Sequence, residues 1–247
     1  MNKVSLKKIG LGFLGIIAYF IFSLVIPYLL NYFIKDFSSI PQLIKMIISI
    51  LTNLLLILTL FAIFKDPITK NYLKLKENHQ DYFKNYFKYW ILIIGTMMIS
   101  NLFILIFSNN EISNNEKIIR DLFSQNPIYV FITAVILGPI IEELVFRQSI
   151  RNIISNNTLF IIISGIIFGS LHVITNITSP SELLYIIPYS LPGMILAYSF
   201  VKSKNIFVPI GLHFINNGLL LSLQFIALIM GGLWKKSLNY FLLLYLF

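Results

Sequence analysis

The chain has 247 residues, of which 57% are hydrophobic and 12% are charged, against about 25% charged residues in soluble domains. Several apolar runs of about 20 residues follow one another, and this length crosses the hydrocarbon core of a bilayer. The sequence therefore predicts an all-α, polytopic integral membrane protein, because a β-barrel would show short alternating segments. The formal net charge is +9, and the absence of cysteine excludes disulfides and a thiol nucleophile.

Seven apolar runs are long enough to be transmembrane helices. They cover residues 9–33, 40–64, 89–107, 128–154, 159–177, 183–201 and 206–230. The apolar residues 238–247 fit either a short eighth helix or a segment at the membrane interface, so we expect seven to eight transmembrane helices. The chain divides into N-terminal membrane helices and loops (1–127), a helical core (128–230) and a short C-terminal segment (231–247).

The N-terminus is basic and leads into an apolar run of about 25 residues, which is long for the core of a signal peptide. No small-residue cleavage site follows, so we expect a retained first helix. Cytoplasmic loops carry an excess of Lys and Arg, which predicts a cytoplasmic N-terminus. Abundant Ile, Asn and Lys are typical of an AT-rich bacterial genome, and the expected location is a bacterial cell membrane.

Residues 65–90 form the most basic stretch between two apolar runs. Their aromatic and apolar side chains recur at steps of three and four, which predicts an amphipathic helix in the cytoplasmic interface. Membrane topology thus explains the positive charge, and we expect no nucleic-acid partner. Docking of a substrate is the less favoured role of this helix. Residues 108–126 are polar and are expected to form an external loop with a short helix.

Two adjacent glutamates and an arginine interrupt the apolar run 128–154. A charge at the centre of a membrane helix costs about 2.5–3.5 kcal/mol on insertion scales, so these residues need a purpose. Glu143 and Arg147 are four residues apart, which predicts an ion pair on one helical face. On the same helix Glu142 points about 100° away from Glu143, and its side chain is expected to face a cavity. Gly138-Pro139 is expected to bend this helix. A purely structural ion pair is the alternative reading.

Two later apolar helices carry further polar side chains at one-turn spacing. Phe168 and His172 lie four residues apart in the first, and His213 and Asn217 lie four apart in the second. Together with the glutamates they supply a general base, imidazoles and an amide donor, which is an inventory for activating water against a carbonyl. Two Glu and two His also suit zinc. If a metal is bound, its candidate ligands are Glu142, His172 and His213.

The motifs Glu142-Glu143-x-x-x-Arg147, Phe168-x-x-x-His172 and His213-x-x-x-Asn217, in this order, resemble the CPBP family of intramembrane proteases. This family includes CAAX-type processing enzymes and bacteriocin-processing or immunity proteins, also called Abi proteins. The resemblance covers about residues 128–220. It implies that Glu142, assisted by His172, activates water, that His213 and Asn217 stabilise the oxyanion, that Glu143 and Arg147 orient the site, and that Phe168 packs against the substrate.

The expected function is therefore hydrolysis of a peptide bond in a small membrane-associated peptide or protein, such as a bacteriocin, leader peptide or pheromone precursor. The main alternative is a non-catalytic membrane protein that gives immunity to a bacteriocin or scaffolds a partner. A proton-coupled transporter is less favoured because no repeated half-structure is visible. Cleavage of prenylated proteins is also ranked lower, since a bacterial host normally offers none. The expected partners are the lipid bilayer and the peptide substrate, and the sequence leaves the oligomeric state open.

Overall fold

The computed structural model describes residues 5–34, 36–107 and 112–230, and in these ranges it contains helices and no strand. The elements are α1 (Leu6–Phe20), η1 (Ile21–Val25), α2 (Ile26–Phe33), η2 (Phe37–Ser39), α3 (Gln42–Ile63), α4 (Lys65–Tyr86), α5 (Lys88–Phe107), α6 (Asn114–Gln125), α7 (Pro127–Val130), η3 (Phe131–Leu137), α8 (Gly138–Glu143), η4 (Leu144–Ser149), α9 (Ile150–Ile153), α10 (Asn157–Ile174), η5 (Pro180–Tyr185), α11 (Ile186–Ser203) and α12 (Phe207–Ile229). The predicted all-α class is confirmed. The apolar run 238–247 lies outside the described residues.

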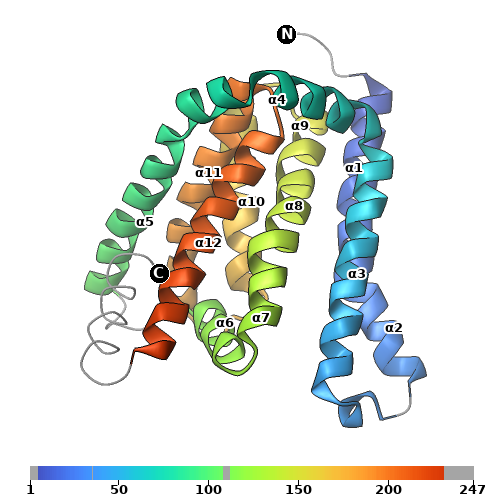
Figure 1. Cartoon of the computed structure of the whole chain (residues 1–247), viewed down its shortest axis with the longest axis vertical. Helices are drawn as coiled ribbons and strands as arrows, with labels where there is room; N and C mark the ends of the chain where they lie inside the picture. The colour runs from blue at the N-terminus through green and yellow to red at the C-terminus, as the bar shows by residue number, and fades with distance from the viewer. Residues whose placement is uncertain (1–4, 35, 108–111, 231–247) are drawn as a thin grey trace.

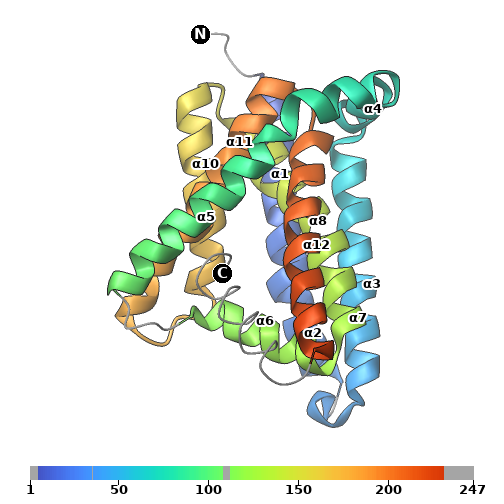
Figure 2. The same ribbon diagram turned by 60° about the vertical axis from the view of Figure 1, so that its left-hand side comes forward.

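Within the described ranges, five helical segments are long and apolar enough to cross a membrane, and a sixth is added if the bent pair α4 and α5 counts as one span. The five are Leu6–Phe33, Gln42–Ile63, Pro127–Ile153, Asn157–Ile174 and Pro180–Ser203. The expected count of seven to eight is not confirmed. Helix α12 runs along the bundle (Figures 1 and 2) but is not among these segments, and it carries five polar side chains, namely His213, Asn216, Asn217, Ser222 and Gln224.

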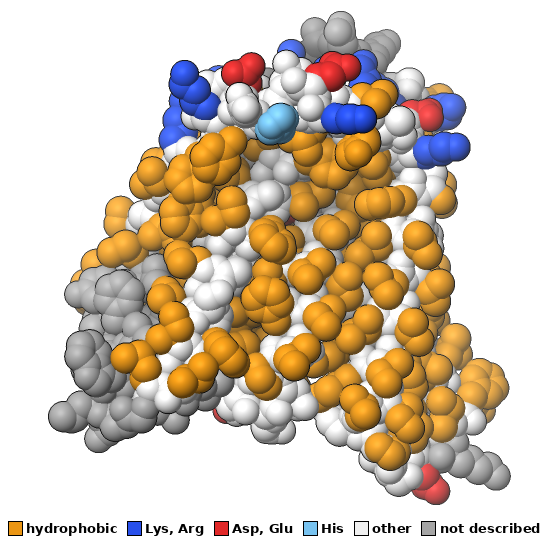
Figure 3. Space-filling view, in the orientation of Figure 1, with side chains coloured by type: hydrophobic (Ala, Val, Ile, Leu, Met, Phe, Trp, Pro, Cys, Tyr) orange, Lys and Arg blue, Asp and Glu red, His pale blue; other side chains and the backbone are white. Residues whose placement is uncertain are grey.

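Helix α4 lies across one end of the bundle, where the basic amphipathic segment was expected (Figures 1 and 2). Lys and Arg side chains gather at this end, and hydrophobic side chains cover the flank below it (Figure 3). Asn71 joins α4 to the start of α12, because its side-chain oxygen accepts a hydrogen bond from the backbone N–H of Ile206 at 2.6 Å and its carbonyl accepts one from Asn205 at 3.0 Å. This end of α12, and with it the polar part of the helix, is thereby fixed.

The segment Pro127–Ile153 carries the two glutamates and is helical throughout, but two π-helical stretches interrupt its α-helical winding. The wider π-helical turns η3 and η4 flank the α-helical turn α8. Pro139 stands in the first turn of α8, where its missing N–H costs least. A side chain at Gly138 would begin 3.0 Å from the carbonyl oxygen of Thr133. The irregularity expected at Gly138-Pro139 is therefore a local change of winding, of a kind that often occurs at functional sites.

Helices α10 and α11 pack closely because α10 offers two glycines, four residues apart, at the contact. A Cβ atom on Gly165 would lie 3.0 Å from the carbonyl oxygen of Ser190. A Cβ atom on Gly169 would lie 2.6 Å from the backbone nitrogen of Ser190 and 2.8 Å from the carbonyl oxygen of Ile186. This close contact fixes α10, which carries His172, against α11.

Replacing Gly169 by alanine is expected to destabilise the protein by at least about 1–3 kcal/mol, the usual cost of overpacking, because the contacting atoms belong to the backbone. Thermal unfolding of the purified protein measures the loss. Gly95→Ala is the matched control, since nothing lies within 4 Å of a Cβ at that position on α5. Equal unfolding temperatures for the two variants would contradict the close packing of α10 on α11.

Candidate active site

A buried ion pair forms the inner end of the candidate site. Glu143 ends α8 and Arg147 lies one turn later in η4, and both side chains are completely buried. Nε of Arg147 lies 2.9 Å from Oε2 of Glu143, although the alignment is too poor for a hydrogen bond. The Arg147 guanidinium also lies 4.8 Å from the centre of the Phe168 ring, a cation–π contact. The ion pair predicted from the four-residue spacing is confirmed.

His213 on α12 connects this ion pair to the second glutamate. Its Nδ1 lies 2.9 Å from Oε1 of Glu143, at hydrogen-bond distance. Its Nε2 lies 3.7 Å from Oε2 of Glu142, whose side chain is 25% exposed. Because a carboxylate only accepts, Nδ1 carries the hydrogen in this contact. In the neutral imidazole Nε2 then carries no hydrogen and is an acceptor. Two hydrogen-bond acceptors, Nε2 of His213 and Oε2 of Glu142, therefore lie close together.

Phe168 lies against both histidines. Its ring centre is 4.5 Å from that of His172 and 5.7 Å from that of His213. The His172 Nδ1 lies 2.9 Å from the carbonyl oxygen of Phe168, and this ring also stacks on Tyr189 at 5.1 Å. A carbonyl only accepts, so Nδ1 of His172 donates and its Nε2 stays an acceptor when the ring is neutral. The structure thus fixes the ring of His172 through Phe168 and Tyr189.

The Asn217 amide, expected to bind an oxyanion, already makes two contacts. Its NH₂ group donates to the carbonyl oxygen of Ala134 at 3.0 Å, and its oxygen accepts a hydrogen bond of 3.4 Å from Asn216. An amide NH₂ has two hydrogens, so one remains for a ligand. The bond to Ala134 ties α12 to the π-helical turn η3 just before α8.

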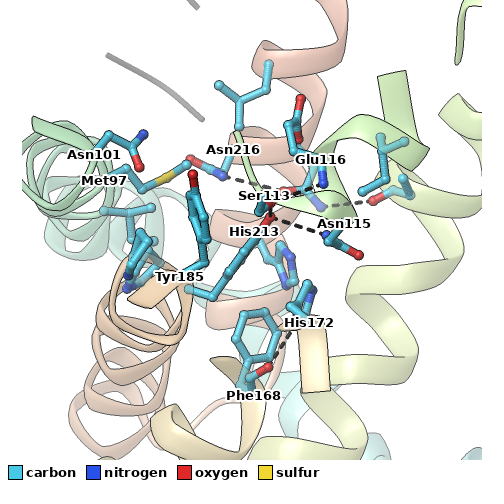
Figure 4. Close-up of a pocket in the computed structure, with 18 of the residues that line it drawn as sticks. Met97, Asn101, Ser113, Asn115, Glu116, Phe168, His172, Tyr185, His213 and Asn216 are labelled. Atoms are coloured by element: carbon cyan, nitrogen blue, oxygen red, sulfur yellow. Dashed lines mark hydrogen bonds between the residues drawn. The ribbon is translucent and has the colours of Figure 1, made fainter. Parts of the chain in front are cut away.

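A cavity of about 160 Å³ opens beside these residues. His172, His213 and Asn217 line it, and Figure 4 shows the two histidine rings close to Phe168. Glu142 is not among the lining residues, so His213 is the group that both lines the cavity and contacts the glutamates. The structure therefore brings six predicted site residues into one chain of contacts, namely Glu142, Glu143, Arg147, Phe168, His172 and His213, and places Asn217 on the wall of the adjoining cavity.

The donor groups do not form a set suited to a metal ion. The described residues contain no cluster of three or more His, Asp or Glu side chains arranged to hold one. Of the three candidate ligands, only His213 and Glu142 form a close pair in the part of the chain that the structure describes, with Nε2 of His213 at 3.7 Å from Oε2 of Glu142. We therefore base the chemistry of the site on its carboxylates, imidazoles and amides.

Sequence analysis missed several further polar residues that line the cavity. They come from α5, α6, α11 and α12 and comprise Asn101, Ser113, Asn115, Glu116, Tyr189 and Asn216. Figure 4 shows Ser113, Asn115 and Glu116 together at the start of α6. Glu116 is held by Nε of Arg120 at 2.6 Å and by Nε2 of Gln224 at 3.1 Å. The short helix expected within residues 108–126 is confirmed as α6. Asn216 could have been identified as a candidate site residue from its position beside Asn217 in an apolar helix.

Glu116 makes the stability of the fold depend on pH. Burial raises the pKa of its carboxyl from 4.5 to about 7, although Arg120 and Gln224 oppose this shift. Between these two values the folded state holds a proton that the unfolded state has lost, so stability falls as pH rises from about 4.5 to about 7. The loss is about 3 kcal/mol, since one pKa unit is worth about 1.4 kcal/mol.

Thermal unfolding at several pH values measures this loss. Glu116→Gln, which keeps the shape of the side chain without its charge, is expected to flatten the decline. Glu77→Gln, at an exposed position of α4, is the matched control and should leave the pH profile unchanged. If the stability of Glu116→Gln falls by the same amount over this pH range, the pH dependence belongs to other titratable groups.

Comparison with known proteins matches one part of the chain. Residues 124–219 match the family model described as type II CAAX prenyl endopeptidase Rce1-like. The matched segment contains all three motifs, from Glu142 to Asn217. Searches of curated proteins and of solved structures give no match.

Proposed function

We propose that the protein hydrolyses a peptide bond with a water molecule held by Glu142 and His213, because residues 124–219 match the Rce1-like CAAX endopeptidase model and several helices of the bundle are long and apolar enough to cross a membrane. The observation that carries this proposal is the 3.7 Å separation between Oε2 of Glu142 and Nε2 of His213. One water can donate its two hydrogens to these two acceptors. Its lone pair then points away from both, toward a substrate carbonyl.

The buried ion pair supports this geometry. Arg147 holds one oxygen of Glu143, and the other oxygen accepts the Nδ1 hydrogen of His213. The imidazole is thereby fixed in the tautomer that presents Nε2 to the water, much as a buried carboxylate orients a catalytic histidine. In this proposal Glu143 and Arg147 are positioning residues, and Glu142 accepts the proton as water attacks.

The remaining groups act on the substrate. The free amide hydrogen of Asn217 is a donor for the oxyanion that forms on the carbonyl carbon. Glu142, once protonated, can return its proton to the leaving amine, which completes hydrolysis. The contacts favour His213 over His172 as the partner of Glu142, so we assign His172 to the cavity wall, where it contacts the substrate together with Phe168.

The substrate class follows from the setting of the cavity. Transmembrane helices surround it and most of its wall is apolar, so a small membrane-associated peptide or protein fits better than a soluble protein. A bacteriocin, a leader peptide and a pheromone precursor all meet this description. The Lys and Arg side chains on the α4 end (Figure 3) favour a cytoplasmic location of that end, in a bacterial cell membrane.

Isotope labelling tests whether the protein hydrolyses peptides. The purified protein, in lipid nanodiscs, is incubated with membrane peptides from cells that lack it, in water enriched in oxygen-18. New C-terminal carboxylates that carry the label, formed by the wild type and not by Glu142→Gln, are expected. Peptide sets that match those of protein-free nanodiscs would favour the non-catalytic alternative, in which the ion pair serves only the fold.

A further inference from the structure

Two buried amides in the cavity are not used by the proposed hydrolysis. Asn101 on α5 and Asn216 on α12 both line the cavity, and they are only 8% and 7% exposed. Nδ2 of Asn101 and Oδ1 of Asn216 have no hydrogen-bond partner among the residues that the structure describes. Figure 4 shows both side chains on the same side of the pocket. Two residues of the cavity wall thus carry buried polar atoms without a partner in the described part of the chain, one a donor and one an acceptor.

Buried polar atoms without partners are unfavourable, so a ligand that satisfies both would gain from this arrangement. The complementary group has an acceptor and a donor of its own, which describes an amide. A charged group fits less well, because Glu116 is the one Asp, Glu, Lys or Arg among the described lining residues and is already paired with Arg120. Apolar side chains such as Met97 and Leu220 form the walls.

We infer that Asn101 and Asn216 form an amide subsite that binds a neutral amide of the substrate next to the cleaved bond. The amide is either a backbone peptide group or the side chain of Asn or Gln. This inference rests on the proposed peptidase function and adds to it a preference for substrates with a neutral amide at this position. Asn216 adjoins Asn217 and lies one turn from His213 on α12, so an amide bound here keeps the neighbouring peptide bond close to the catalytic groups.

A binding experiment tests the subsite without any need for hydrolysis. Full-length Glu142→Gln protein in nanodiscs is titrated with three amphiphiles of equal chain length: N-methyldecanamide, decanamide and methyl decanoate. The first imitates a backbone peptide group, the second an Asn or Gln side chain, and the ester offers an acceptor but no donor. The shift in unfolding temperature gives each apparent Kd, and protein-free nanodiscs correct for partition into lipid.

At least one amide is expected to bind about tenfold more tightly than the ester, a typical effect of a buried hydrogen-bonded pair. A preference confined to N-methyldecanamide assigns the subsite to the peptide backbone, and one confined to decanamide assigns it to a side-chain amide. Asn101→Leu and Asn216→Leu keep the side-chain size and should abolish the preference. Asn53→Leu, on α3 and outside the cavity, is the matched control and should retain it.

Equal affinities of the amides and the ester for the protein with both asparagines would overturn the inference, as would a tenfold preference that survives in both leucine variants. The comparison of probes on the intact cavity decides the question even where a variant does not fold. Because the titration uses a protein without Glu142, its outcome is independent of the isotope-labelling test of hydrolysis.

Discussion

Glu142→Gln is expected to lower the rate of peptide hydrolysis by about 10²–10⁴-fold, the usual contribution of a general base. Glutamine keeps the size of the side chain but cannot accept the proton of the attacking water at neutral pH. The fold should survive, because the Glu142 side chain is 25% exposed and lies 3.7 Å from Nε2 of His213, which is beyond hydrogen-bond distance. Initial rates on a peptide that the wild type cleaves, at equal protein concentration, measure the effect.

Two further variants test whether the loss of activity is specific to the general base, Glu142. Glu77→Gln removes a carboxylate from the exposed face of α4 and should leave the rate unchanged. His213→Leu should also slow hydrolysis strongly, because it removes the second acceptor for the water. A Glu142→Gln protein that cleaves within a fewfold of the wild-type rate would remove Glu142 from the mechanism.

Arg147→Ala is expected to destabilise the protein by about 3–5 kcal/mol, because it leaves the charge of Glu143 buried without its partner. The variant should unfold at lower temperature and accumulate to lower levels in the membrane. Arg151→Ala provides the control, since Arg151 is part-exposed and bonds to the loop carbonyl of Ser155 at 2.9 Å. Its loss of stability should be clearly smaller.

A paired replacement separates loss of charge balance from loss of packing. Glu143→Leu combined with Arg147→Met removes both charges and keeps most of the volume. This double variant should be more stable than Arg147→Ala, because no buried charge remains without a partner. It should not cleave peptides, since His213 loses the carboxylate that orients it. Wild-type stability of Arg147→Ala would show that the ion pair does not hold the site together.

Contacts within one helix were predictable from the sequence. The ion pair of Glu143 and Arg147 follows from their four-residue spacing. The basic helix α4 followed from its charge and its aromatic periodicity. Each of these features depends on local geometry that any helix shares, so no knowledge of the tertiary structure was needed.

Contacts between helices were not predictable in the same way. Which histidine lies nearest Glu142 depends on the rotation and depth of α10 and α12, and the structure favours His213. The bond from Asn217 to Ala134 depends on the π-helical turn η3, which changes the winding just before the glutamates. The expected number of spans is not confirmed, since α12 runs along the bundle without being among the qualifying segments and residues 238–247 lie outside the described residues.

The most direct test of the central claim compares peptides from cells that carry the wild-type protein with peptides from cells that carry Glu142→Gln, at matched protein levels. Membrane and secreted fractions are analysed for new peptide ends by mass spectrometry. We predict ends that occur only with the wild type and that identify the cleaved bond and its substrate. Identical peptide sets, together with a cellular effect that Glu142→Gln still provides, would contradict the account and indicate a non-catalytic role.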